Sequence, residues 1–398
     1  MITSVKISNF FSFRSQTITL RSRNFLVGIN GSGKSNFIKA LRVLKATIAE
    51  GELENLIVNR WGGFDNIMFS GTPAGDGQSF SIEYEFNPSV LGDYGYHFQE
   101  PIFYKISFFK LEATQNYTFT EKFFTKTETG KQKYVYMRAS RGKGWAREGI
   151  TNDQHTVAYV LENMSDSMLS QLVDKDRYYQ IYTLRRAIAD ISIYTYFDTT
   201  ENSPIRKPAL PTGVSKLLGD GSNLPQILNW IKINNKSDYR RITESLQSIN
   251  PMMTGIDFHV LGSNIELLLE EEKLNKSVHV AHVSDGTLRF LCLMAIICNS
   301  KRGRLVCIDE PEVGLHPDMI SEFMDAMENL SEDYQFIIST HNELVLSQTS
   351  VENVLVCEKD EDNSTQITTF RDEEFVKWAA AFSVGNLWRN GDLGGNRF

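Results

Sequence analysis

Gly28-Ile29-Asn30-Gly31-Ser32-Gly33-Lys34-Ser35 fits the pattern G-x-x-x-x-G-K-[ST] of a phosphate-binding loop. Glycines allow backbone conformations with positive φ, so successive N–H groups can point inward at an anion. In this pattern Lys34 reaches the β- and γ-phosphates of a nucleotide, and the hydroxyl of Ser35 is a ligand of magnesium. The stretch therefore predicts a nucleotide-binding α/β core.

The residues on either side of this loop have the patterns that a phosphate loop requires. Phe25-Leu26-Val27 is a short apolar run typical of a buried strand. After the loop, apolar residues recur at the spacing of one helix face, at Phe37, Leu41, Leu44 and Ile48. The sequence thus predicts a strand, a glycine loop and a helix whose positive end faces the phosphates.

A second informative stretch lies far downstream, where the apolar run 305–308 ends in Asp309-Glu310. An acidic pair at a strand end, following a phosphate loop, indicates a Walker B motif. Asp309 would hold magnesium, directly or through water, and Glu310 would polarise the attacking water as general base. A strand that ends in a solvated charged turn would look the same locally, but the following Pro-Glu-Val-Gly-Leu-His-Pro at 311–317 favours the motif.

Two further segments fit the same chemistry. The buried-type strand 336–338 runs into Ser339-Thr340-His341, and a histidine at such a strand end can hydrogen-bond a γ-phosphate; otherwise it would be a surface residue. Ser284-Asp285-Gly286-Thr287 precedes the apolar helix 288–297, where a hydroxyl, a backbone N–H and the helix dipole could meet an anion. Locally, Ser284 also has the properties of a simple N-cap.

Taken together and in this order, the motifs resemble those of ABC-type ATPase heads of the RecF, SMC and OLD-like group. The opening stretch 2–13 also resembles the first strand of that group. More narrowly, the chain is similar to compact bacterial ATPases that share the segments 219–225 and 391–395. The motif segments that carry the resemblance are Gly28 to Asn36, Ser284 to Leu288, Cys307 to Pro317 and Ser339 to His341.

The resemblance implies a P-loop NTPase head, with a mixed sheet and flanking helices, that closes around ATP and Mg²⁺ as a homodimer. In such a dimer the signature serine presses on the γ-phosphate held by the other subunit. It also implies catalytic roles for Glu310, His341 and Lys34, and magnesium contacts from Ser35 and Asp309. The nucleotide contacts that it implies are Gly28, Asn30, Gly31, Ser32, Gly33, Lys34, Ser35, Asn36, Ser284, Asp285 and Gly286.

The chain departs from the wider group in several ways. Its signature reads S-D-G-T rather than the S-G-G-Q of transporters, a form usual in the compact proteins. The glutamine of the loop that normally links head to lever could be Gln78, Gln99 or Gln115, and the sequence does not choose among them. The middle has no long heptad run, which argues against a coiled-coil arm. We expect too little sequence after His341 for the nuclease domain of OLD proteins.

The composition of the chain argues against several classes of protein. The 41% hydrophobic content is ordinary for a globular protein, and the net charge of −8 argues against a general nucleic-acid coat but not against a local basic groove. The sequence shows no signal peptide and no run of about 18 apolar residues, so we expect a cytoplasmic protein without a membrane partner. The four cysteines lie in apolar contexts without a C-x-x-C pair, which predicts reduced core residues rather than a zinc site.

We expect the head to be split into a first part at 1–50 and a second part at 254–398, with a β-rich lobe at 51–150 and a helical insertion at 151–253. In the lobe, 79–86 alternates as a half-buried strand does and predicts antiparallel pairing. In the insertion, Val157, Val160, Leu161 and Met164 have helical spacing, as do apolar residues at 224–231. A hairpin is expected at 256–269, followed by a strand at 278–282 and, near the end, a helix at 378–382.

The segment 121–147 is rich in cations with interleaved aromatic residues. Such a hairpin could follow a phosphate backbone and stack on bases, or dock an acidic protein. It could also be an exposed edge hairpin whose lysines discourage aggregation, the interpretation that we favour. The cations are Lys122, Lys126, Lys131, Lys133, Arg138, Arg141, Lys143 and Arg147, and the aromatic residues are Phe123, Phe124, Tyr134, Tyr136 and Trp145.

Three functions remain open at this point. The first is an antiphage defence ATPase that controls a separately encoded effector, such as a nuclease. The second is a RecF-like repair ATPase that binds DNA. The third is an ATP-binding assembly scaffold with little turnover. The sequence leaves open the trigger, the partner and any assembly larger than a dimer.

Overall fold

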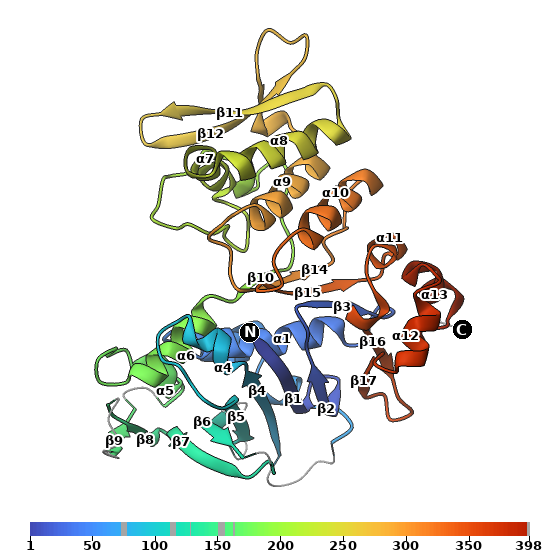
Figure 1. Ribbon diagram of the computed structural model, residues 1–398. Helices are drawn as coiled ribbons and strands as arrows, with labels where there is room; N and C mark the ends of the chain where they lie inside the picture. The colour runs from blue at the N-terminus through green and yellow to red at the C-terminus, as the bar shows by residue number, and fades with distance from the viewer. Residues whose placement is uncertain (73–77, 112–116, 128, 150–155, 162–163, 396–398) are drawn as a thin grey trace. The chain divides into compact units, whose positions relative to one another are not determined.

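The structure is a computed structural model that describes residues 1–72, 78–111, 117–127, 129–149, 156–161 and 164–395 (Figure 1). The chain forms two compact units. The first unit contains residues 1–191 and 355–369 and the described tail from 394, and the second contains 192–354 and 370–393. The phosphate loop lies in the first unit, whereas the acidic strand end, His341 and the signature segment lie in the second.

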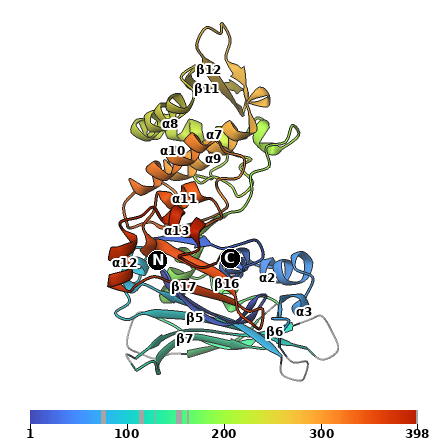
Figure 2. The same ribbon diagram turned by 90° about the vertical axis from the view of Figure 1, so that its right-hand side faces the viewer.

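An antiparallel sheet dominates the first unit and is seen from the side in Figure 2. Its order is β2-β1-β4-β5-β6-β7-β8-β9, and each neighbouring pair is antiparallel. This confirms the predicted antiparallel pairing and shows that the first two strands of the chain belong to the same sheet. The strands are β1 (Ile2–Phe10), β2 (Phe13–Thr19), β4 (Ser79–Phe86), β5 (Ile102–Lys110), β6 (Tyr117–Lys126), β7 (Gln132–Ser140), β8 (Lys143–Arg147) and β9 (Thr156–Val160).

One face of this sheet is buried and the other faces solvent, because side chains alternate along each strand. Tyr84 and Tyr104 lie on the buried face, and the Tyr84 hydroxyl donates to the carbonyl of Ala40 in helix α1 (Lys34–Ala46). The apolar face of α1 that the sequence predicted is buried, including Phe37, Leu41 and Leu44. The helix that follows the phosphate loop is thus anchored on the sheet.

The helical spacing at 157–164 gave a wrong prediction. Residues 156–160 form strand β9, which pairs with β8 and places Val157 opposite Ala146. Val160 and Met164 are 71% and 69% exposed, so their spacing does not mark a buried helix face. Pairing with β8 overrides the local pattern, and alternating β-branched and aromatic side chains in T-V-A-Y-V fit a strand.

The remaining elements of the first unit are short or support the loop. Strands β3, β16 and β17 stand next to one another in the sheet order, and β16 pairs antiparallel with β17. Their bounds, with those of the short helices, are β3 (Arg23–Val27), β16 (Val354–Lys359), β17 (Thr365–Thr369), α2 (Glu52–Glu54), η1 (Asn55–Arg60), α3 (Phe64–Ile67), α4 (Pro88–Gly92), α5 (Met168–Gln171) and α6 (Tyr179–Ala189).

The second unit is built on parallel strands β10 (Ser192–Tyr194), β14 (Leu305–Asp309) and β15 (Gln335–Thr340). Tyr194 lies opposite Ile308, and Asp309 lies opposite Ser339. Because parallel strands end at the same edge of a sheet, the residues that follow them are brought together there. In helix α9 (Asp285–Ile297), every residue from Phe290 to the end is buried, as the apolar run predicted.

Helices and a small sheet complete the second unit. Helix α7 (Leu224–Asn234) and the hairpin of β11 (Met253–Leu261) and β12 (Asn264–Glu271) confirm the patterns read from the sequence. The strand expected at 278–282 is shorter: β13 (Val278–His279) gives way to the 3-10 turn η3 (Val280–His282). The carbonyls of Val280 and Ala281 accept hydrogen bonds from Arg206 instead of from a neighbouring strand.

The other helices of this unit are α8 (Lys236–Ile249), α10 (Pro317–Glu328), α11 (Glu343–Ser347), α12 (Glu373–Ala379) and α13 (Val384–Asn390), with 3-10 turns η2 (Pro204–Arg206) and η4 (Val351–Asn353). The helix expected at 378–382 ends early, since α12 stops at Ala379. All four cysteines are buried, as predicted. Among the described residues, none of the helices has the length and apolar character needed to cross a bilayer.

Candidate nucleotide site and signature loop

The phosphate loop has the backbone conformation that its glycines predict. Gly31 and Gly33 have φ of +83° and +115°, the left-handed region that favours glycine. A Cβ on Gly33 would lie 2.2 Å from the Thr365 hydroxyl oxygen, and one on Gly28 would lie 2.4 Å from the carbonyl oxygen of Cys357. The loop therefore has no room for side chains at these two positions.

A group of polar side chains braces the loop from within the first unit. Thr365 Oγ1 donates to the Ser32 carbonyl at 2.7 Å and lies 2.7 Å from Ser12 Oγ. Ser12 Oγ also accepts from Asn36 Nδ2 at 2.8 Å. The sequence gives no signal for Ser12 or Thr365 in this role, because neither belongs to the motif and Thr365 is more than three hundred residues away along the chain.

The loop and the start of α1 can accept a phosphate group. Lys34 Nζ donates to the carbonyls of Gly28 and Ile29, at 2.7 and 3.3 Å, so its charge lies at the inner side of the loop. Helix α1 begins at this loop without a side-chain cap and without an acidic residue in its first turn. Its positive end and free N–H groups are available to an anion. Asn30 and Gly31 on the loop and Ser35 in the first turn of α1 are all exposed.

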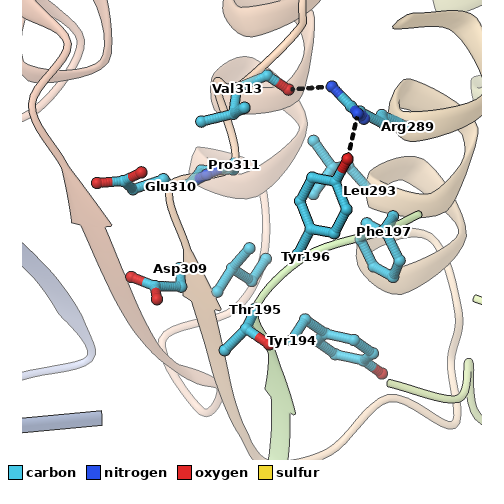
Figure 3. A pocket seen from close by; sticks show the side chains of 11 residues that line it. Tyr194, Thr195, Tyr196, Phe197, Arg289, Leu293, Asp309, Glu310, Pro311 and Val313 are labelled. Carbon is cyan, nitrogen blue, oxygen red and sulfur yellow. Dashed lines mark hydrogen bonds between the residues drawn. The ribbon is translucent and has the colours of Figure 1, made fainter. Parts of the chain in front are cut away.

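The acidic strand end is rigidly held within the second unit. Glu310 has φ of +49°, which is uncommon for a residue with a side chain, and its N–H points at both the carbonyl (3.1 Å) and the hydroxyl (3.0 Å) of Ser339. The Ser339 hydroxyl donates to Asp309 Oδ1. Pairing of β14 with β15 thus holds the Asp309 carboxylate and the Glu310 backbone, and the two carboxylates point to the same side in Figure 3.

His341 lies beside this acidic group; its predicted contact with a γ-phosphate stays a prediction. Its Nδ1 lies 3.3 Å from Glu310 Oε1 and 3.8 Å from Glu312 Oε1. Glu312 is buried and accepts hydrogen bonds from Thr340 Oγ1 at 2.7 Å and from the His341 N–H at 3.2 Å. Burial raises the pKa of Glu312 above its ordinary value, against the opposing effect of these hydrogen bonds.

Glu312 is a residue that the sequence analysis quoted but did not assign. It holds the backbone of His341, and so the ring that faces Glu310. Its position two residues after Glu310, in a turn that also contains Pro311, was the available signal. That signal was insufficient, because burial of a carboxylate cannot be read from a polar turn.

The signature segment forms the start of helix α9. Ser284 is its N-cap: Ser284 Oγ accepts from the Thr287 N–H at 3.2 Å and lies 2.8 Å from Thr287 Oγ1. A Cβ on Gly286 would lie 3.0 Å from the Gly314 carbonyl, so the helix start touches the loop after the acidic pair. The N-cap interpretation is confirmed, and it leaves open a further contact with a phosphate, since the first turn still presents N–H groups.

A cavity of ≈ 260 Å³ lies beside the acidic pair and is drawn in Figure 3. It is lined by the residues that follow β10, including Thr195 and Tyr196, and by Asp309, Glu310 and Arg289. Neither Gln78 nor Gln99, which precede β4 and β5, lines this cavity, and Gln115 lies outside the described residues. Thr195 directly follows β10, which pairs with β14.

A family described as "AAA domain, putative AbiEii toxin, Type IV TA system" matches residues 23–347, which include every motif described above. The chain belongs to this family. The Old nuclease of Escherichia phage P2 is 24% identical over 415 aligned positions, covering 97% of this chain and 65% of the relative. The Retron Vc95 probable ATPase of Vibrio cholerae is 29% identical over 102 positions, covering 25% of this chain and 20% of that protein.

This chain therefore spans less than two thirds of the length of each of these relatives. Among solved structures, an Smc head bound to the C-winged helix domain of ScpA has a TM-score of 0.60 at 14% identity, covering 94% of this chain and 99% of that one. An Smc head with an extended coiled coil, bound to the C-terminal domain of ScpA derived from Pyrococcus furiosus, has a TM-score of 0.57 at 13% identity, covering 96% and 98%. The fold is that of an ABC-type ATPase head of the RecF, SMC and OLD group.

The residues of this ABC-type head fit a nucleotide and Mg²⁺. The glycine loop leaves a cradle without side chains, and Ser32 Oγ is buried without a hydrogen-bond partner in the described part of the chain. No group of three or more metal-ligating side chains occurs among the described residues. A magnesium site on a nucleotide does not require one, because it uses one or two protein ligands together with phosphate oxygens and water.

Proposed function

We propose that this chain hydrolyses ATP in the cytosol as a homodimer and uses this cycle to control a separately encoded effector, such as a nuclease, in antiphage defence. The observation that carries the ATPase proposal is the group formed by Asp309, Glu310 and His341, held by Ser339 and Glu312. Such a group can orient a water molecule for attack on the γ-phosphate. A scaffold that only binds ATP does not need this step.

Glu310 is the proposed general base. Its backbone is held in the left-handed region by two contacts with Ser339, which fixes the direction in which its side chain leaves the chain. Strain of this kind costs about 1–3 kcal/mol and persists where the surrounding structure imposes it, often at functional sites. His341, which Glu312 holds by its N–H, would donate to the γ-phosphate while its Nδ1 faces Glu310.

Lys34 and Ser35 are proposed to bind the β- and γ-phosphates and the magnesium ion, together with Asp309. Magnesium, when bound, neutralises charge on the phosphate oxygens. Ser284 and Gly286 are proposed to contact the γ-phosphate bound by the other protomer. Ser284 can do so when Thr287 Oγ1 donates to it, because its hydroxyl then accepts from the Thr287 N–H and hydroxyl with its lone pairs and keeps its own hydrogen to donate.

The proposal of a defence role rests on the relatives. One is named as a nuclease of a phage and another as a retron ATPase. This chain matches the first over 97% of its length and the second over 25%. It also belongs to a family whose description names a putative toxin of a toxin–antitoxin system. The identity of the effector protein has to come from a partner that co-purifies with this chain.

The decisive experiment is sedimentation velocity of the Glu310→Gln variant with Mg-ATP. We expect a stable dimer, because the variant binds ATP but cannot activate the water. The same variant with ADP, and the double variant Lys34→Ala/Glu310→Gln with ATP, should remain monomeric. If Glu310→Gln stayed monomeric with Mg-ATP at concentrations that saturate its nucleotide site, the dimer proposal would be wrong.

A second candidate function, binding of DNA, is favoured by a row of cations on the solvent face of the antiparallel sheet. Lys105, Lys122 and Arg138 lie directly opposite one another on β5, β6 and β7. Like charges in register are destabilising, and the pKa of Lys122 is lowered by partial burial and by its two cationic neighbours. None of the three has a carboxylate partner in the part of the chain described; Glu83, opposite Lys105, pairs with Lys126.

The expected hairpin at 121–147 is therefore only partly correct. Its strands lie inside the sheet rather than at an edge, and several of its aromatic rings are used for packing, such as Phe123 against Tyr136. Next to the cations runs a row of hydroxyls, where Ser81, Ser107, Thr120 and Ser140 lie opposite one another. Hydroxyls and cations together can contact a phosphate backbone without reading bases.

Fluorescence anisotropy with duplex DNA at several salt concentrations tests this candidate. Replacing Lys105, Lys122 and Arg138 by Gln should reduce the slope of log K against log salt by about 2.7, since each phosphate contact contributes about 0.9. Replacing Lys126 and Lys133, which pair with Glu83 and Glu100, should change this slope little. Equal slopes for the triple variant and the wild type would exclude this face as the DNA site.

A further inference from the structure

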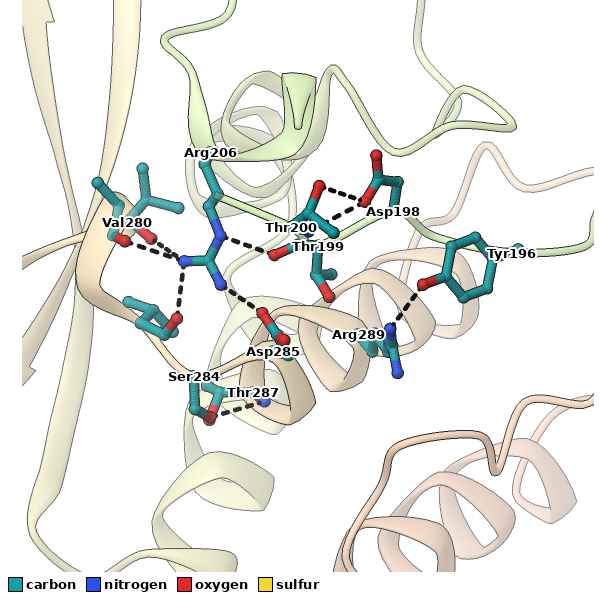
Figure 4. Close-up of polar contacts among 12 residues, drawn as sticks. Tyr196, Asp198, Thr199, Thr200, Arg206, Val280, Ser284, Asp285, Thr287 and Arg289 are labelled. Carbon is teal, nitrogen blue, oxygen red and sulfur yellow. Dashed lines mark hydrogen bonds and ion pairs between the residues drawn. The ribbon is translucent and has the colours of Figure 1, made fainter. Parts of the chain in front are cut away.

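Arg206 is a buried cation that lies against the signature loop, defined here as residues 283–287. Only 8% of its side chain is exposed, and every one of its guanidinium nitrogens has a hydrogen-bond partner (Figure 4). Nε donates to the Thr199 carbonyl at 2.8 Å, and Nη2 donates to Asp285 Oδ1 at 2.5 Å. Asp285 is the second residue of the S-D-G-T signature.

The third nitrogen of Arg206 holds the backbone that leads into the signature loop. Nη1 lies within hydrogen-bond distance of three carbonyl oxygens, those of Val280, Ala281 and Val283, at 3.0, 3.1 and 2.7 Å. These carbonyls belong to the turn where β13 ends, which explains why the chain leaves the sheet there. The Arg206 side chain thus holds both the backbone that precedes Ser284 and the carboxylate of Asp285, which follows it.

Only arginine can make this set of contacts. Burying a cation is costly unless its donors are satisfied, and the planar fork of arginine presents five N–H groups in three directions. A lysine in the same place would offer a compact ammonium, which cannot reach carbonyls on one side and a carboxylate on another. The carbonyls that lost their donor would be buried and unsatisfied, which is also costly.

The segment that carries Arg206 begins at the acidic strand end. Thr195 follows Tyr194, which lies opposite Ile308, so the segment 195–206 leaves the sheet beside Asp309, and its first three residues line the cavity there. Tyr196 accepts a hydrogen bond from Arg289 of α9 at 3.0 Å, and Arg289 also donates to the Val313 carbonyl at 3.3 Å. The segment thus contacts the acidic edge, the signature helix and, through Arg206, the signature loop.

We propose that Arg206 is the positioning residue of the signature loop, which it holds in the conformation that contacts the γ-phosphate bound by a second copy of this chain. The segment 195–206 links this loop to the strand end that carries Asp309 and Glu310. The inference rests on the proposed ATP-dependent dimer and adds the residue that prepares one of its two faces.

The test is the dimer dissociation constant of Arg206→Lys in the Glu310→Gln background, measured by sedimentation with Mg-ATP. We expect dimerisation to weaken by about tenfold or more, since one or two hydrogen bonds to charged groups are lost from the loop. The affinity of the monomer for a fluorescent ATP analogue should stay within about twofold, because the phosphate loop does not depend on Arg206. A residue with a merely structural role would not separate these two measurements.

Arg302→Lys is the matched control. Arg302 Nη1 donates to the carbonyls of Ile297 and Asn299, at 2.7 and 2.9 Å, at the other end of α9. This variant should lose thermal stability by a similar amount but leave dimerisation unchanged. If Arg206→Lys dimerised as tightly as its parent, or if Arg302→Lys weakened the dimer equally, the inference about Arg206 would be overturned while the dimer itself stood.

A second variant keeps the inference testable should Arg206→Lys fail to fold. The Asp285 side chain is 59% exposed, so Asp285→Ala can fold while it removes the partner of Nη2. We expect faster hydrogen exchange of the amides at 283–287 and a weaker dimer; unchanged exchange and an unchanged dimer would contradict the inference. A Glu310→Gln parent that never dimerises would instead overturn the proposed function, and the inference with it.

Discussion

The phosphate loop and the acidic strand end are two halves of the predicted chemistry that are built in different ways. The loop is one continuous stretch, and its shape follows from the glycines and from the helix that starts in it. The acidic end is assembled from β14, β15 and the turn after each, and its key side chains are held by residues about thirty positions apart. A short motif can specify the first, whereas strand pairing creates the second.

This difference predicts how mutations act. In the loop, a single substitution should remove binding directly, since the residues themselves contact the ligand. At the acidic end, substitutions of supporting residues should change rates more than affinities.

Lys34→Ala should lower ATP affinity by about 100-fold or more, because two charge-assisted hydrogen bonds to phosphate contribute about 1.5–3 kcal/mol each. Titration of the purified monomer with a fluorescent ATP analogue measures this loss of affinity. Lys39→Ala removes a lysine of the same helix that bonds to Asn36, and it should stay within about threefold of wild type. Wild-type affinity in Lys34→Ala would show that the nucleotide lies elsewhere.

Gly33→Ala should lower ATP affinity by about tenfold and also lower the melting temperature. Its Cβ would meet Thr365 Oγ1 at 2.2 Å, so the brace of the loop must move. Gly31→Ala is the matched control, because its Cβ would meet nothing within 4 Å and only the cost of positive φ, about 1 kcal/mol, remains. Equal losses in both variants would show that the brace through Thr365 has no role in binding.

Glu312→Ala should reduce the rate of ATP hydrolysis by about tenfold with a KM within about twofold, since it releases the His341 backbone without touching the loop. Glu312→Gln keeps an acceptor for Thr340 and His341 and should retain most of the rate. Steady-state kinetics on both variants measures the difference. A rise in KM with an unchanged rate would mean that Glu312 acts on binding instead.

Glu121→Gln should have the smallest effect and should appear as a change in pH dependence. Glu121 is fully buried in the first unit, accepts from Tyr104 at 2.8 Å and Ser167 at 2.6 Å, and has a pKa raised by burial. A raised pKa in the folded state means that wild-type stability is greatest below the unfolded pKa and falls as pH rises through the folded value.

The wild type should therefore lose stability relative to Glu121→Gln by up to about 1.4 kcal/mol for each pH unit between the two pKa values. Thermal unfolding from about pH 4.5 upward, read from the first unit, measures the difference between the two proteins. A difference that stays constant with pH would show that Glu121 remains ionised throughout this range.

Much of the second unit and of the loop could be predicted from patterns alone. Buried strands such as 305–308 and 336–338, and the helix 288–297, are apolar runs long enough to be decisive, and the structure confirms them. The stretch 157–164 could not be predicted, because its apolar spacing fits a helix and only the neighbouring strand β8 makes it a strand. The cations of 121–147 were visible, but which of them lie in register with Lys105 depends on strand pairing.

The sequence alone determined the phosphate loop, the acidic pair, the histidine after its strand and the N-cap of the signature helix. These features depend on residues close together along the chain, whose backbone preferences and periodicity act locally. Only the tertiary structure decided that Thr365 braces the loop, that Glu312 holds His341 and that Arg206 supports the signature loop. Each of these contacts requires burial of a polar group against a distant partner, and burial is a property of the packed chain rather than of any segment.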